Sequence, residues 1–230
     1  MNMPHQTSAF GHALPASSQN RVLRNTYMLL ALSMIPTVIG AVVGIQLQFN
    51  FLAGSPFMAF MLFLGMAWAF MWGIEKNKNS GLGVALLLAF TFFMGLMLSR
   101  ILQVALGFSN GGSMITLAAG GTGAVFFTMA SIASVSKRDF SNMGKFLFVG
   151  VIVALLAMVA NIFLQIPALS LTISAIVVLL FSAYLLYDIN RIVRGGETNY
   201  VSATLAVYLD VYNIFIHLLN LIMAFTGERD

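Results

Sequence analysis

Long apolar stretches separated by short polar segments make up most of this chain. Residues 25–74 contain no charged side chain, and neither do residues 146–187. Each of these runs is long enough for two membrane spans of about 20 residues. Gln48 to Pro56 divides the first run and Gln165 to Pro167 divides the second, because both segments contain residues that favour turns. The pattern therefore predicts two pairs of transmembrane helices from these runs alone.

Three further apolar stretches bring the expected number of spans to seven. We expect helices at about 25–47, 56–74, 81–101, 114–135, on both sides of Gln165–Pro167, and at 200–226. The predicted fold is an all-α integral membrane bundle formed by residues 21–230. Gly40 and Gly44 are spaced as a GxxxG pair, which favours close packing of the first helix against another.

The first 20 residues differ from the rest of the chain. They are polar, contain two prolines, and carry no Lys or Arg. A signal peptide would need a positive segment followed by an apolar one, so this segment is not one. We interpret residues 1–20 as a flexible cytoplasmic tail.

The basic residues indicate the orientation of the helices. Seven spans place nine of the eleven Lys and Arg residues on one side, and positive residues are concentrated on the cytoplasmic side of membrane proteins. The nine are Arg21, Arg24, Lys76, Lys78, Lys137, Arg138, Lys145, Arg191 and Arg194, whereas Arg100 and Arg229 lie on the other side. We therefore expect the N-terminus in the cytoplasm and the C-terminus outside. A six-span alternative, with 200–226 lying in the interface, leaves the other assignments unchanged.

Composition supports the membrane assignment. The chain is 60% hydrophobic and 8% charged, with a mean hydropathy of +0.93, whereas soluble domains have about 25% charged residues. The absence of cysteine excludes disulfides, thiol catalysis and cysteine-ligated metals. The net charge of +4 does not indicate nucleic-acid binding, because the basic residues lie at helix ends.

No enzyme signature is present. The sequence lacks H-E-x-x-H, G-x-S-x-G and any histidine cluster with metal-ligand spacing. Gly120 to Gly123 is not a phosphate loop, because no strand precedes it and no lysine follows. An intramembrane aspartic protease would need Y-D and G-x-G-D. Tyr187-Asp188 matches the first motif, but Asp210 follows Tyr208-Leu209. We therefore expect a protein that is not an enzyme and has no cofactor.

Two aspartates lie within the last two apolar runs. A carboxylate in hydrocarbon is costly, which makes Asp188 and Asp210 candidate functional residues. Asp210, Asn213, His217 and Asn220 are spaced i, i+3, i+7 and i+10, so they share one face of a helix. That face must contact protein or water rather than lipid.

The two aspartates are expected to meet. Asp188 lies about two turns before Gly195 and Asp210 about three turns after residue 200, so both enter from the same side to similar depth. Two nearby carboxyl groups titrate as a unit and share a proton, which makes the pair a pH-sensitive switch. The alternative is a structural pair that fixes the register of two helices. Oxygen ligands suit Ca²⁺, but so few of them make only a weak transit site rather than a tight metal site.

Neighbouring side chains are candidates for supporting roles. Tyr184, Asp188 and Arg191 share a helix face, so Arg191 is either a counter-ion for Asp188 or a cytoplasmic anchor. His217 is either a proton relay or an interior histidine held by hydrogen bonds.

Several segments resemble one family of membrane proteins. The segments Y-D-I-N-R-I, G-G-E-T-N-Y and Y-L-D-V-Y-N-I-F-I-H-L-L resemble the signature of the Bax inhibitor-1 family. V-L-R-N-T-Y and M-V-A-N-I-F-L-Q are similar to its bacterial YccA branch. The resemblance extends over nearly the whole chain after residue 20.

This resemblance implies a fold and two functions. The last helix would lie in the middle of a ring formed by the other six. In YetJ-type members, two aspartates at the positions of Asp188 and Asp210 share a proton and gate a calcium leak according to pH. An arginine at the end of the second helix latches that pair. Here the region has no arginine, and Lys76 or Lys78 is the possible substitute.

Members of the YccA branch are linked to the protease FtsH and its HflK/HflC partners in the bacterial inner membrane. Residues 1–20 are the expected contact in that case. We therefore expect a calcium-permeable leak, with modulation of FtsH as the alternative.

Overall fold

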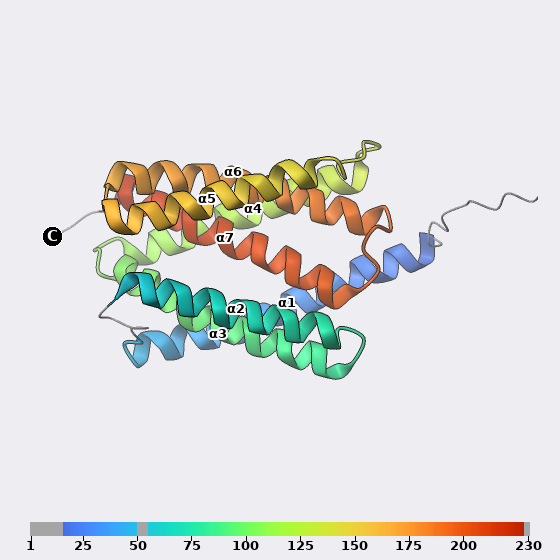
Figure 1. Cartoon of the computed structure of the whole chain (residues 1–230), viewed down its shortest axis with the longest axis horizontal. Helices are drawn as coiled ribbons and strands as arrows, with labels where there is room; N and C mark the ends of the chain where they lie inside the picture. Colours follow the sequence, from blue (N-terminus) through green and yellow to red (C-terminus); the bar gives the residue numbers. More distant parts are fainter. Residues whose placement is uncertain (1–15, 50–54, 228–230) are drawn as a thin grey trace, which may run out of the picture.

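The computed structural model describes residues 16–49 and 55–227, and the regular secondary structure of these ranges is entirely α-helical. Figure 1 shows seven long helices running roughly along one axis. Their bounds are α1 Ala16–Gln46, α2 Pro56–Asn77, α3 Gly81–Leu106, α4 Gly111–Val135, α5 Met143–Leu164, α6 Pro167–Val193 and α7 Tyr200–Thr226. All seven are long and apolar enough to cross a membrane. The predicted seven-span helical bundle is therefore confirmed.

Local residue chemistry explains where several helices begin and end. Pro56 stands at the start of α2, where its missing N–H costs nothing, and the Ser55 hydroxyl accepts a hydrogen bond from the Met58 amide. Asn199 caps α7 by accepting hydrogen bonds from two amides of its first turn. Gly195 has a φ of +77° just after α6, a conformation that glycine adopts without strain.

The start of α1 is the main difference from the expected bounds. Residues 16–20 were expected in the tail, but they belong to α1, which begins nine residues before the predicted position. The rest of the predicted tail, residues 1–15, lies outside the described residues.

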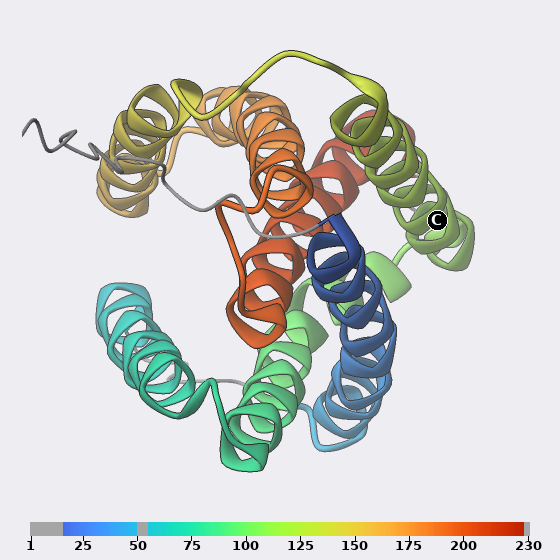
Figure 2. The same cartoon turned by 90° about the vertical axis from the view of Figure 1, so that its right-hand side faces the viewer.

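The last helix crosses the middle of the bundle. Figure 2 shows α7 between two groups of helices, α1–α3 and α4–α6. It contacts every other helix except α5. The Tyr208 hydroxyl hydrogen-bonds Thr37 of α1 at 2.9 Å, and the Tyr212 hydroxyl donates to the Met94 carbonyl of α3 at 2.9 Å. The expected central position of the last helix is confirmed, and these bonds tie α7 to the first group.

Small residues bring α1 and α3 into backbone contact. A methyl group added at Gly40 would strike the backbone of Phe92, and one added at Gly95 would strike the backbone of Thr37. The packing role predicted for the GxxxG pair is therefore confirmed for Gly40. At Gly44 the added group would strike the Ser99 side chain.

The two ends of the bundle differ in charge. We call the end at which α1, α3, α5 and α7 begin the basic face, because nine of the ten described Lys and Arg residues lie in or near it. We call the other end, where α3 and α7 finish, the opposite face. It carries Arg100, near the end of α3.

Candidate functional site at the aspartate pair between α6 and α7

Asp188 and Asp210 meet inside the bundle, as the sequence predicts. α6 places Asp188 near its last turns, and α7 places Asp210 about three turns from its start. The two carboxyl groups lie within interaction distance of each other. A hydrogen bond between them requires a proton on one of them, because two carboxylates have no donor. The structure thus brings together two acids from different helices.

Asp210 is the more deeply buried member of the pair. Its side chain is 3% exposed, and its Oδ2 atom has no hydrogen-bond partner in the described residues. A buried, unpartnered carboxyl oxygen costs stability, about 1–3 kcal/mol for a neutral group. Val207 and Ile214, three residues before and four residues after it on the same helix, are fully buried. Because no hydrogen bond to Oδ2 offsets this cost, Asp210 is a functional candidate.

The expected neighbours of the pair lie around it. Tyr184 of α6 lies near both aspartates. Arg191, one turn beyond Asp188, acts on Asp188 as a positive charge. The direct ion pair of Arg191, however, is to Glu197 at 3.4 Å. The direct contacts of Arg191 are therefore to the loop after α6, and its role towards Asp188 stays a prediction.

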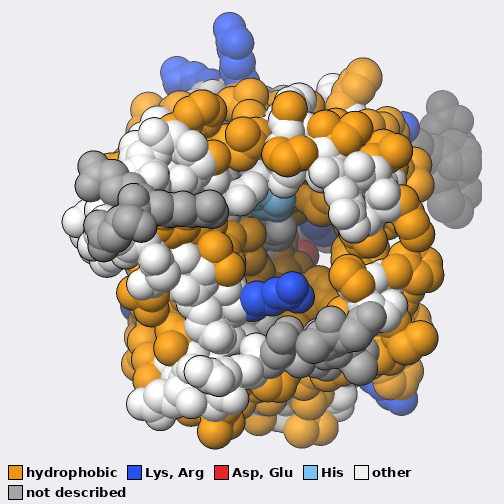
Figure 3. Space-filling model, turned by 90° about the vertical axis from the view of Figure 1, so that its left-hand side faces the viewer, with side chains coloured by type: hydrophobic (Ala, Val, Ile, Leu, Met, Phe, Trp, Pro, Cys, Tyr) orange, Lys and Arg blue, Asp and Glu red, His pale blue; other side chains and the backbone are white. Residues whose placement is uncertain are grey.

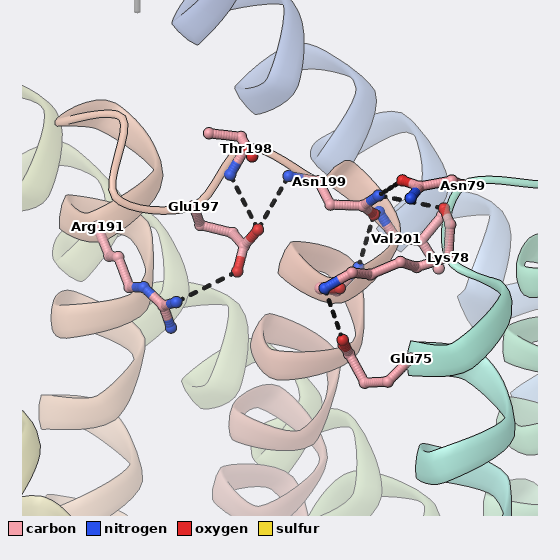
Figure 4. A network of polar contacts seen from close by, with 9 residues as sticks. Glu75, Lys78, Asn79, Arg191, Glu197, Thr198, Asn199 and Val201 are labelled. Atoms are coloured by element: carbon pink, nitrogen blue, oxygen red, sulfur yellow. Dashed lines mark hydrogen bonds and ion pairs between the residues drawn. The ribbon is translucent and has the colours of Figure 1, made fainter. Parts of the chain in front are cut away.

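A polar network joins two loops at the basic face (Figure 4). The Glu197 carboxylate accepts hydrogen bonds from the Thr198 and Asn199 amides, each at 2.9 Å. Arg191 donates from Nε to the Gly196 carbonyl at 3.2 Å and pairs with Glu197. These bonds fix the α6–α7 loop across the end of α6.

The same network reaches the loop between α2 and α3. Asn199 donates from Nδ2 to Asn79 Oδ1 at 2.7 Å and to the Lys78 carbonyl at 3.2 Å. Lys78 pairs with Glu75 at 2.9 Å, and this hydrogen bond raises the pKa of Lys78. The network therefore links α2 to the α6–α7 loop beside the aspartate pair.

The two lysines considered as latch residues have other partners. Lys78 is held by Glu75, and the ammonium group of Lys76 lies 4.7 Å from the centre of the Trp72 ring. Both lysines thus interact with residues of α2.

The polar stripe of α7 is the helix face shared by Asp210, Asn213, His217 and Asn220. Its last residues lie towards the opposite face. His217 Nδ1 is 3.1 Å from the Ser174 hydroxyl of α6, and Asn220 Nδ2 donates to the same hydroxyl at 2.9 Å. Ser174 is 2% exposed. Asn213 instead donates from Nδ2 to the Leu209 carbonyl of its own helix at 2.8 Å. The expectation of a hydrogen-bonded interior histidine agrees with these contacts.

A cavity opens beside these residues. It has a volume of about 250 Å³ and lies between α3, α5, α6 and α7. Its lining residues are Ile101, Met158, Asn161, Ile162, Ser170, Ile173, Ser174, Ile216, His217 and Asn220. Figure 3 shows the opposite face hollowed in its middle, with a basic side chain across the mouth and a histidine and an acidic group visible deeper inside.

Ser174, Glu75 and Glu197 are among the residues of these sites that were not predicted. Ser174 is one serine among several in apolar helices, and nothing in its spacing marks it. Glu75 and Glu197 lie at helix ends, where charged residues are ordinary, and their roles depend on loops that meet only in the folded chain. The G-G-E-T-N-Y segment that contains Glu197 was the one available signal.

Comparison with known proteins shows similarity along almost the whole chain. The model of the family described as inhibitor of apoptosis-promoting Bax1 matches residues 19–227. An uncharacterized protein of Neisseria meningitidis serogroup A is 40% identical, over 97% of this chain and 99% of that protein. The Escherichia coli K12 protein named modulator of FtsH protease YccA is 40% identical, over 89% of this chain and 90% of its own length.

A second Escherichia coli strain has an equally similar protein, named inner membrane protein YccA. An uncharacterized protein of Pseudomonas aeruginosa is 38% identical over 87% of both chains. The family match covers α2 to α7 and all but the first three residues of α1, and it includes both aspartates. The chain therefore belongs to the Bax inhibitor-1 family of membrane proteins.

Proposed function

We propose that the protein is a pH-sensitive, calcium-permeable leak of the bacterial inner membrane, gated by Asp188 and Asp210. The observation that carries this proposal is the meeting of two carboxyl groups from different helices in the middle of the bundle. Intramembrane acids of this kind mark ion pathways and proton relays. The basic face would lie in the cytoplasm, following the distribution of positive residues.

The pair supplies the physical basis for a gate. With one shared proton, an O–H···O⁻ bond draws α6 and α7 together, and this bond is stronger than a neutral one. With a second proton the attraction weakens, and with none the two charges repel each other. Each protonation state therefore favours a different spacing of α6 and α7. Oxygen atoms are also the ligands that Ca²⁺ prefers.

Calcium uptake into dye-loaded proteoliposomes tests the leak. Wild-type protein should admit calcium faster than protein-free vesicles, and Asp210→Asn should change the rate. Asparagine keeps the size of the side chain and can still donate to Asp188, so the variant removes the titration while preserving a hydrogen bond. Equal uptake by wild-type and empty vesicles would sink the leak proposal.

A second function is favoured by a specific observation. The 40% identical protein of Escherichia coli is named a modulator of FtsH protease. We propose that this chain also modulates an FtsH-type protease, alone or with HflK/HflC, and that residues preceding α1 make the contact. This proposal is a binding function and does not require an ion pathway.

Truncation distinguishes the two proposals. The structure places the start of α1 at Ala16, so removal of residues 2–15 leaves the helix intact. The truncated protein should keep calcium uptake but should no longer slow degradation of a membrane substrate by co-expressed FtsH. Unchanged protection would rule out the tail as the contact, and loss of uptake would mean that the two roles are not separate.

A further inference from the structure

The polar stripe of α7 continues from the aspartate pair towards the cavity of the opposite face. Asp210, Asn213, His217 and Asn220 occupy one side of the helix, and ten residues separate the first from the last. At 1.5 Å per residue, Asn220 lies about 15 Å further along the axis than Asp210. His217 and Asn220 line the cavity, whereas Asp210 belongs to the buried pair.

The two asparagines are oriented in the same way. Asn213 directs its amide nitrogen to the Leu209 carbonyl, and Asn220 directs its nitrogen to the Ser174 hydroxyl. A backbone carbonyl only accepts hydrogen bonds, which fixes the orientation of the Asn213 amide. In both residues the amide nitrogen donates a hydrogen bond, and the amide oxygen does not take part in that bond.

Those oxygens are available. Neither Asn213 Oδ1 nor Asn220 Oδ1 accepts a hydrogen bond within the part of the chain that the structure describes. Over the described ranges, the buried polar side-chain atoms without a hydrogen-bond partner are Asp210 Oδ2 and Ser202 Oγ. Neither amide oxygen is among them. Asn220 lines the cavity, and Asn213 lies about two turns nearer to Asp210 on α7. Asp210 Oδ2 is a further oxygen without a hydrogen-bond partner within the described residues.

The Ser174 hydroxyl orders the other cavity groups. It accepts a hydrogen bond from Asn220, so its own hydrogen is free to go to His217 Nδ1. If Nδ1 accepts that hydrogen, the ring proton lies on Nε2. The bond to Ser174 holds the Asn220 amide with its nitrogen towards the hydroxyl.

We propose that Asn213 and Asn220 form, with Asp210, a ladder of oxygen ligands that conducts a hard cation from the opposite face to the aspartate pair. Neutral carbonyl oxygens replace the hydration shell of a cation without trapping it, as conduction requires. The three oxygens are hard ligands of the type that Ca²⁺ prefers over nitrogen or sulfur. The inference rests on the proposed leak and adds the residues that determine its selectivity.

Cysteine labelling tests the ladder without depending on flux. The native chain has no cysteine, so single substitutions give unambiguous reaction sites. Asn213→Cys and Asn220→Cys should react with a membrane-impermeant cationic thiosulfonate added to the outside of spheroplasts. Leu205→Cys and Leu219→Cys are the controls, because both side chains are buried and, at about 3.6 residues per turn, lie on the side of α7 away from Asp210. We expect the first two to react at least about tenfold faster than the controls, a difference of about 1.4 kcal/mol in barrier.

Calcium flux provides the second arm. Asn213→Leu and Asn220→Leu should each lower calcium uptake about tenfold, which corresponds to losing about 1.4 kcal/mol of stabilisation for the passing ion. Asn213→Gln keeps an amide oxygen and should retain most of the flux.

The outcomes separate the two proposals. Wild-type flux combined with control-like labelling at residues 213 and 220 would overturn the ladder and leave the leak standing. The same holds if both leucine variants conduct normally. Absence of wild-type flux would overturn the leak and, with it, the ladder as an ion path, whatever the labelling shows.

Discussion

Gly95→Ala is expected to destabilise the bundle by forcing α1 and α3 apart. The added methyl group would lie 2.9 Å from the Thr37 carbonyl carbon and 3.0 Å from the Ala41 nitrogen, and closer still to the Thr37 oxygen. These are backbone atoms of α1, so no side-chain rotation relieves the contact. Ordinary contact at this site begins at 3.4 Å. The helices must therefore separate along the seam that also positions Thr37 for its bond to Tyr208.

The magnitude follows from two opposing terms. Overpacking a close-packed interior costs about 1–3 kcal/mol, whereas alanine is favoured over glycine within a helix by about 0.5–1 kcal/mol. We expect a net loss of about 1–2 kcal/mol, because the contact involves rigid backbone. For a chain of this size each kcal/mol lowers Tm by about 2–4 °C, which predicts a decrease of about 2–8 °C.

Thermal unfolding in detergent micelles measures this effect. Gly65→Ala is the matched control, because a methyl group there meets nothing within 4 Å. The control should keep or slightly raise Tm through the helix preference of alanine. A Gly95→Ala protein as stable as Gly65→Ala would refute the claim that the α1–α3 seam is in backbone contact.

Three further predictions concern single groups. Tyr208→Phe removes the hydrogen bond to Thr37 and should cost about 0.6–1 kcal/mol in the same unfolding assay; a larger loss would mean a wider role for that hydroxyl. Gly195→Ala should cost about 1–2 kcal/mol because of the positive φ, and Gly195→Asn should cost less. Hydrogen bonds from Ser141 lower the pKa of Asp139 below 3.8, so its stabilising contribution is present at neutral pH and is lost as the pH falls through that lowered pKa. Carbon-13 NMR should show Ser141→Ala raising this pKa, and an unchanged value would contradict the assignment.

The sequence predicts the helices well because apolar length is a direct physical requirement of the bilayer. It does not predict the early start of α1, since residues 16–20 are polar and extend a helix beyond the apolar span. The change from polar to apolar residues near residue 21 marks the membrane boundary. It does not mark the end of the helix, which continues through residues 16–20.

The aspartate pair was predictable for a different reason. Counting turns from the α6–α7 loop places Asp188 and Asp210 at similar depth, and two neighbouring antiparallel helices must then bring them together. The partner of Arg191 was not predictable, because Glu197 lies in a loop whose path depends on Gly195 and Asn199. Ser174 was not predictable either, since its role depends on which face of α6 meets α7.

Calcium flux across pH 5 to 8 tests the central claim most directly. Wild-type protein in dye-loaded proteoliposomes would be compared with Asp188→Asn, Asp210→Asn and Asp139→Asn. The last variant removes an exposed carboxylate outside the pair, and is therefore the control. If the pair is the gate, wild type and control conduct with the same pH dependence, and both pair variants lose it. If either pair variant keeps the wild-type pH dependence, or if wild type conducts no faster than empty vesicles, the proposed gate is contradicted.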